Sequence, residues 1–125
     1  MPKKALESLT ESMFYVLMAF CHGPMCGIDV SSFIAAKTKG VLSLGPATLY
    51  TILGKFEKEG YIQEIQIDGR KRTYQITERG LDAYQNEVLR LKRCIADAES
   101  ERGIWSGERE ERTQKCMEIP ALSGI

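Results

Sequence analysis

The first apolar pattern along the chain predicts a helix behind Thr10, a residue type that caps helices well. Apolar side chains recur there every three or four residues, at Met13, Phe14, Leu17, Phe20 and Cys21. Gly23 and Pro24 follow, and a glycine followed by a proline ends a helix. These residues therefore predict a first helix with one apolar face.

A second, shorter helix is predicted over residues 27–36. Its apolar residues Ile28, Phe33 and Ile34 are expected to face the core, and Gly40 closes the segment. Residues 41–43 are then expected to form a short extended piece.

Gly45 and Pro46 open a third helix, because a proline in the first turn loses only an N–H without a helical partner. This helix is predicted to run to about Glu59 and to stop at Gly60. Its apolar face consists of Leu49, Ile52, Leu53 and Phe56. The opposite side carries Ala47, Thr51, Gly54 and Lys58, flanked by Thr48, Lys55 and Tyr50. The exposed surface is thus small and hydroxyl-bearing near its start and cationic toward its end.

After the third helix, apolar and polar residues alternate instead of recurring every three or four positions. This pattern predicts a strand over residues 61–67 and a returning strand over residues 73–76. Asp68 and Gly69 mark the turn between the strands. Three cations follow the turn: Arg70, Lys71 and Arg72. Three helices followed by a hairpin with a basic tip predict a mainly α fold with a small β-hairpin, a winged helix-turn-helix.

A fourth helix is predicted behind Thr77, with the acid Glu78 in its first turn. Six residues follow at steps of three and four: Leu81, Tyr84, Val88, Leu91, Ile95 and Ala98. These steps form a heptad seam. The seam packs either on its own domain or on a second copy of the chain. We favour the second copy, because the preceding helices already form a core with one another.

The chain is therefore divided into three parts. Residues 1–77 are the predicted DNA-binding domain, residues 78–102 the C-terminal dimerisation helix that Gly103 ends, and residues 103–125 a tail. The tail shows no clear periodicity and is expected to be mobile or loosely attached. Its Trp105 either lines an effector pocket or anchors the tail, and the sequence leaves this open.

Composition restricts the class of protein. The 125 residues suit one domain, and 17 basic residues balance 17 acidic ones. A zero net charge argues against a strongly basic chromatin protein, although a local basic patch suffices for binding phosphates. No apolar run is long enough to span a membrane, and the first residues do not resemble an export signal, so a cytoplasmic location is expected.

The sequence offers no constellation for catalysis. Its four cysteines lack a zinc-binding spacing and there is only one histidine, His22, so neither a metal site nor a cofactor site is predicted. Nucleophilic catalysis needs a histidine close to the nucleophile, and the adjacent side chains of Cys21 and His22 would point in different directions on a helix, so the chain is not expected to be an enzyme. Cys94 flanks the heptad seam and is interpreted as a quiet buried thiol rather than a redox switch.

The winged-helix pattern favours double-stranded DNA as the partner, because a helix fits the major groove and a cationic wing meets phosphates. The expected DNA-contacting residues are Pro46, Ala47, Thr48, Tyr50, Thr51, Lys55, Arg70, Lys71 and Arg72. Threonines suit base edges, whereas Tyr50 and Lys55 are better placed for phosphates.

Two alternatives stay open. Gly54 costs roughly 1 kcal/mol in a helix against alanine; it has no role, packs closely on another helix, or lets a DNA strand approach. The three wing cations either contact phosphate or are merely solvated. At the level of the whole protein, the alternative is a winged-helix module that binds proteins and not DNA.

Several segments together resemble the PadR-type transcriptional regulators. They are LTESMFYVL at residues 9–17, GPMCGIDV at 23–30, LGPATLY at 44–50, FEKEGYI at 56–62 and GRKRTYQITERG at 69–80. The resemblance extends over roughly residues 9 to 100. It implies a homodimeric repressor on a pseudo-palindromic operator, with a winged-helix head and a C-terminal dimerisation helix. Because such regulators often release DNA when a planar compound binds, a small aromatic effector is an expected further partner. The fourth helix has no tryptophan between Glu78 and Arg102, however, so a stacking pocket for a flat ligand is not implied.

Overall fold

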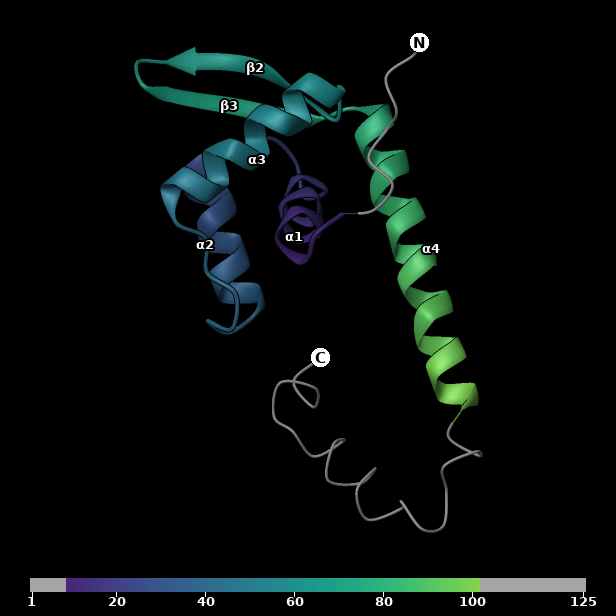
Figure 1. The fold of residues 1–125 in the computed structure, drawn as a ribbon. Helices are drawn as coiled ribbons and strands as arrows, with labels where there is room; N and C mark the ends of the chain where they lie inside the picture. The colour runs from purple at the N-terminus through teal and green to yellow at the C-terminus, as the bar shows by residue number, and fades with distance from the viewer. Residues whose placement is uncertain (1–8, 102–125) are drawn as a thin grey trace. The chain divides into compact units, whose positions relative to one another are not determined.

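The structure is a computed structural model that describes residues 9–101 (Figure 1). Its elements in chain order are α1 (Glu11–Phe20), β1 (Met25–Cys26), α2 (Gly27–Lys37), α3 (Pro46–Glu59), β2 (Ile62–Asp68), β3 (Lys71–Ile76) and α4 (Glu78–Ser100). The predicted mainly α fold with a small hairpin is confirmed. The chain divides into two compact units within α4, after Val88. The predictions for Gly103, Trp105 and the tail 103–125 lie outside the described residues.

The sheet contains one strand that the sequence pattern did not predict. β1 pairs antiparallel with β3, placing Met25 opposite Tyr74, and the strand order is β1-β3-β2. A strand of two residues is too short to show an alternating pattern. On the other side of β3, Glu64 pairs with Tyr74 and Gln66 with Thr73, so Ile65 is the extra residue of a β-bulge.

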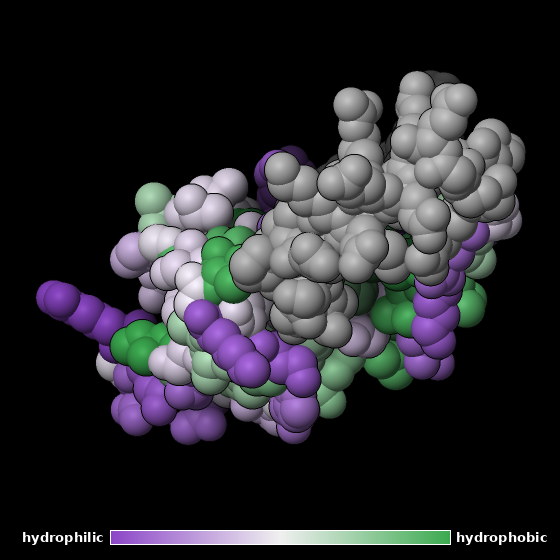
Figure 2. All heavy atoms as spheres, turned by 90° about the horizontal axis from the view of Figure 1, so that it is seen from below, coloured by the Kyte–Doolittle hydropathy of each residue, from purple (hydrophilic) through white to green (hydrophobic). Residues whose placement is uncertain are grey.

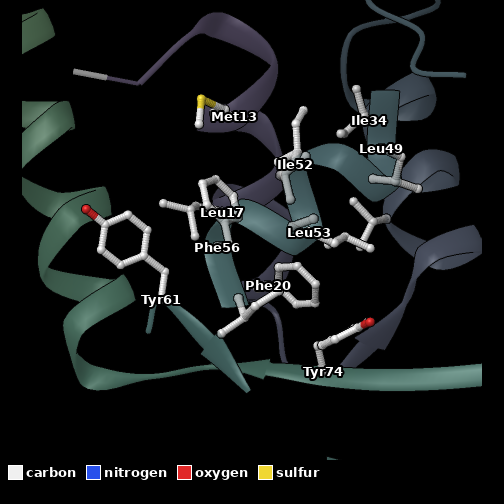
Figure 3. Close-up of a cluster of buried hydrophobic side chains, with 14 of the residues drawn as sticks. Met13, Leu17, Phe20, Ile34, Leu49, Ile52, Leu53, Phe56, Tyr61 and Tyr74 are labelled. Atoms are coloured by element: carbon white, nitrogen blue, oxygen red, sulfur yellow. The ribbon is translucent and has the colours of Figure 1, made fainter. Parts of the chain in front are cut away.

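The core of the first unit lies between α1, α2, α3 and the sheet. Figure 3 shows its labelled side chains: Met13, Leu17, Phe20, Ile34, Leu49, Ile52, Leu53, Phe56, Tyr61 and Tyr74. The whole predicted apolar face of α3 is buried in this cluster. Burial of each large side chain contributes about 1.5–3 kcal/mol, so this cluster holds α3 firmly in place.

Three predicted positions are wrong. Ile28 is 75% exposed rather than buried, because Val30 and Ile34 face the core and Ile28 lies about 200° around the helix from Val30. Cys21 is exposed, because it is the cap residue beyond the last turn of α1. Residues 41–43 form bends instead of an extended piece, and the Thr38 hydroxyl accepts a hydrogen bond from the Leu42 amide at 3.0 Å.

The start of α4 is fixed to the end of α3. The Thr77 hydroxyl accepts from the Gly80 amide at 3.1 Å, as predicted for a cap, and donates to the Gly60 carbonyl at 2.6 Å. Gly80 packs so closely that a Cβ there would overlap the Tyr61 carbonyl oxygen. One turn later, the Tyr84 ring stacks on Phe14 of α1, with ring centroids 5.2 Å apart. Part of the predicted seam therefore has a partner within its own unit.

The described part of the second unit is the helical segment from Leu89. Leu89 is 65% and Ile95 is 58% exposed. Cys94 is also exposed, so its interpretation as a buried thiol is wrong for the single chain; the Arg90 Nη1 lies 3.8 Å from its Sγ. Within residues 9–101, no helix combines the length and the apolar character that crossing a membrane requires.

Candidate nucleic-acid interface

The exposed side of α3 has the composition that the sequence predicted. The expected contact residues of this helix are all exposed: Pro46, Ala47, Thr48, Tyr50, Thr51 and Lys55. Pro46 occupies the first turn behind the N-cap Gly45, and Gly60 ends the helix. A rigid helix therefore presents short side chains near its start, where the backbone can approach a base edge.

The two threonines of this surface differ in their hydrogen bonding. The Thr51 hydroxyl donates to the Ala47 carbonyl at 2.9 Å, which leaves its oxygen as an acceptor. No residue between 9 and 101 hydrogen-bonds the Thr48 hydroxyl, which can still donate or accept. Thr51 thus suits a cytosine amino group or a thymine methyl, and Thr48 suits either kind of partner.

Gly54 lies in open space. A Cβ built on it meets nothing within 4 Å. Close packing on another helix within the described chain is therefore not the reason for a glycine here. The interpretations that remain are an absent role and the approach of a DNA strand.

The wing carries the three predicted cations, but not in equivalent surroundings. Gly69 turns the chain with a φ of +64°, a conformation that favours glycine, and Lys71 and Arg72 already belong to β3. The Arg72 Nε lies 3.5 Å from the Glu64 Oε2, and the two side chains are 60% and 24% exposed. No ion pair within residues 9–101 engages Arg70 or Lys71.

The pair between Glu64 and Arg72 was missed by the sequence prediction. Both side chains lie on one face of the hairpin, since Glu64 is opposite Tyr74 and Arg72 is two residues from Tyr74. Burial raises the pKa of the Tyr74 phenol, as does the Glu57 charge, whereas Arg72 lowers it through a hydrogen bond and its charge. Arg72 is thus paired with Glu64 of its own hairpin, whereas Arg70 and Lys71 have no ion pair within residues 9–101.

A groove of about 430 Å³ lies between α2, α3 and the wing. We call it the α2–wing groove; its lining residues are Cys26, Gly27, Ile28, Asp29, Tyr50, Arg70, Lys71 and Arg72. The first turn of α2 was missed as part of the site, and the polar neighbours of Ile28 were the only signal that this end of the helix is exposed. The Asp29 carboxylate turns back to accept from the Cys26 amide at 3.4 Å and its thiol at 3.2 Å.

Residues 9–101 hold no group of three or more His, Cys, Asp or Glu side chains arranged to bind a metal ion. Although Cys21 is exposed by area, its thiol is partly desolvated, which raises its pKa and keeps it protonated and poorly nucleophilic near neutral pH.

The family model for the PadR-like transcriptional regulators matches residues 16–86. The chain belongs to this family. The match includes most of the core, all of α3, the wing and the first turns of α4, so the PadR resemblance of the sequence is confirmed. The PadR-like family is one of transcriptional regulators and not of enzymes.

Solved structures share the PadR-like fold. A transcriptional regulator from Clostridium thermocellum, Cth-833, is 27% identical over 70% of this chain and 87% of its own, with a TM-score of 0.60. H. salinarum RosR is 18% identical over 89% of this chain and 92% of its own, with a TM-score of 0.56. Bacillus subtilis PadR, solved in complex with operator DNA, is 22% identical over 61% of this chain and 45% of its own, with a TM-score of 0.55. The comparison with curated proteins gave no match.

Proposed function

We propose that this PadR-like chain is a sequence-specific DNA-binding regulator that works as a homodimeric repressor. The observation that carries the proposal is the exposed face of α3, with its small and hydroxyl-bearing side chains, beside two wing cations that have no ion pair within the described chain. The apolar face of the same helix is buried, so the polar face is held rigidly for a partner. B. subtilis PadR has this fold and was solved with operator DNA.

The contacts divide by chemistry. Pro46, Ala47, Thr48 and Thr51 begin α3 and approach base edges in the major groove. The longer side chains contact the backbone, namely Tyr50, Lys55, Arg70 and Lys71, with Arg72 held back by Glu64. Phosphate contacts position the protein, and the residues at the start of α3 determine the sequence it selects.

The homodimer is proposed to form through α4. Its seam is Leu81, Tyr84, Val88, Leu91, Ile95 and Ala98. Ile95 exposes an apolar side chain to solvent, which a second copy would cover. Two-fold symmetry then places two copies of α3 on two half-sites, so the operator is pseudo-palindromic. Repression, its relief by a small aromatic effector, and action in the cytoplasm complete the proposal; they follow from the family resemblance.

Selection of genomic fragments by the purified protein tests this function. Bound fragments are sequenced after selection at about 50 mM and about 200 mM salt. We expect enrichment of a two-fold symmetric site, with affinity that falls steeply with salt because each phosphate contact releases counterions. A matched control is the variant Thr48→Ala/Thr51→Ala, which should retain salt-dependent binding but lose the enrichment.

The opposite outcome has a definite meaning. If no fragment is enriched at either salt concentration, the repressor proposal fails. The exposed face of α3 is then better explained as the surface of a protein-binding module.

A further inference from the structure

The α2–wing groove brings together polar groups from three segments that are far apart in the sequence. The first turn of α2 forms one wall, Tyr50 of α3 another, and the wing residues 70–72 the third. Because Tyr50 is 58% exposed, it belongs both to the groove and to the exposed face of α3. The groove is thus continuous with the surface that we propose to contact DNA.

Gly27 determines where the Tyr50 hydroxyl lies. A Cβ on Gly27 would be 3.3 Å from the Tyr50 oxygen and 3.5 Å from its Cε1, so the ring rests directly against the glycine backbone. No group within residues 9–101 hydrogen-bonds the Tyr50 hydroxyl. The phenol is therefore held by packing alone, and its O–H is available to an incoming acceptor.

The charges that line the groove favour an anion. Arg70 and Lys71 have no ion pair within the described chain, whereas Arg72 is shared with Glu64. The one carboxylate of the lining, Asp29, is engaged by the amide and thiol of Cys26. One phenolic and two cationic donors around a groove suit a group with several acceptor oxygens, such as a phosphate.

We propose that the α2–wing groove takes one backbone phosphate of the bound DNA, held by the Tyr50 hydroxyl, Arg70 and Lys71. Gly27 is a positioning residue that sets the place of the Tyr50 hydroxyl. This inference rests on the proposed function, because DNA supplies the phosphate. It adds that α3 and the wing bind the same phosphate, with α2 positioning the Tyr50 ring, rather than the wing contacting the backbone separately.

Methylphosphonate scanning tests the shared phosphate. Duplexes carrying the selected operator are made with one neutral methylphosphonate at a time, and their affinities are measured for the full chain. For the wild type, neutralising the seated phosphate should weaken binding about tenfold. Tyr50→Phe and Lys71→Gln should each weaken binding to the unmodified operator and lose the sensitivity at the same backbone position. Lys37→Gln, which removes a charge outside the groove, should keep the full pattern.

A double-mutant cycle tests the role of Gly27. Gly27→Ala should weaken operator binding several-fold, because the added methyl group would lie 3.3 Å from the Tyr50 oxygen and shift it by a few tenths of an ångström away from the phosphate position. In a Tyr50→Ala background the same substitution should have no further effect, since there is no ring to displace. Thermal unfolding of each variant shows whether the fold is intact. An effect of Gly27→Ala that is unchanged in the Tyr50→Ala background would overturn its role as a positioning residue.

The remaining outcomes separate this inference from the proposed function. If the wild type selects an operator but Tyr50→Phe and Lys71→Gln keep the complete methylphosphonate pattern, the phosphate seat is wrong and the regulator proposal stands. If inorganic phosphate saturates the groove below millimolar concentration while the DNA pattern is unchanged, the groove binds a free anion and the inference fails. If the wild type binds no duplex, the proposed function itself has failed.

Discussion

The two amphipathic helices α3 and α4 differ in how far their apolar side chains are buried. The four apolar residues of α3 are all buried, whereas α4 leaves Leu81, Leu89 and Ile95 exposed. Figure 2 shows apolar side chains of the described residues reaching the surface at several separate places on the face drawn. A helix whose apolar face is already covered can offer only its polar face, which suits nucleic acid. A helix with an uncovered apolar face is suited to a protein partner.

The largest test of this contrast is the cost of truncating one buried apolar side chain of α3 and one exposed apolar side chain of α4. Phe56→Ala empties a fully buried position in α3 and should lower the free energy of unfolding by about 3–5 kcal/mol. Leu89→Ala, on the exposed side of α4, should change it by less than about 0.5 kcal/mol. Denaturant unfolding measures both. Equal costs would show that α4 is as fully covered as α3, and the contrast would be lost.

The next test asks whether α4 needs a second copy. Ile95→Glu places a charge in the proposed seam and should raise the dimer dissociation constant about tenfold or more, because a charge would be buried between helices. Leu89→Glu is the matched control, since Leu89 is equally apolar and exposed but lies off the seam. Sedimentation velocity over a concentration series measures the dissociation constants. A monomeric wild type at micromolar concentration would contradict the dimer.

The next and smaller effect concerns the three cations of the wing. Neutralising Arg70 and Lys71 together should weaken DNA binding for all sequences and lower the slope of log affinity against log salt by about 1, because the two cations neutralise the same phosphate. Arg72→Gln should change the slope less, because Glu64 already balances that charge. Affinities at four or more salt concentrations give the slopes. If each of the three cations makes the same contribution to the salt slope, the ion pair between Glu64 and Arg72 opens when DNA binds.

The smallest expected effect concerns Gly54. Gly54→Ala should raise the free energy of unfolding by about 1 kcal/mol, because the methyl group enters open space and the backbone entropy cost falls. It should also weaken DNA binding if a strand approaches here. Gly80→Ala is the contrasting variant, expected to destabilise because its methyl group meets the Tyr61 carbonyl. Unchanged DNA affinity in Gly54→Ala would leave that glycine without a role.

Periodicity was enough to predict α3 and its two faces, because a surface helix records its burial every third or fourth residue. It could not predict β1 or the Ile65 bulge, since both depend on which residues of β3 they meet. The Glu64–Arg72 pair and the α2–wing groove were missed for the same reason. The heptad spacing did not indicate which partner each seam residue has. Tyr84 follows this spacing, yet its ring stacks on Phe14 of its own unit.

The Ile65 bulge has a consequence for how the protein behaves at high concentration. β2 is an outer strand of the sheet, and it exposes both Ile65 and Ile67. A straight outer strand with exposed isoleucines is a template on which strands of other molecules add and aggregate. The extra residue breaks the regular spacing of the backbone N–H and C=O groups and twists the strand. The bulge thus hinders the addition of further strands to β2 and helps to keep the protein in solution.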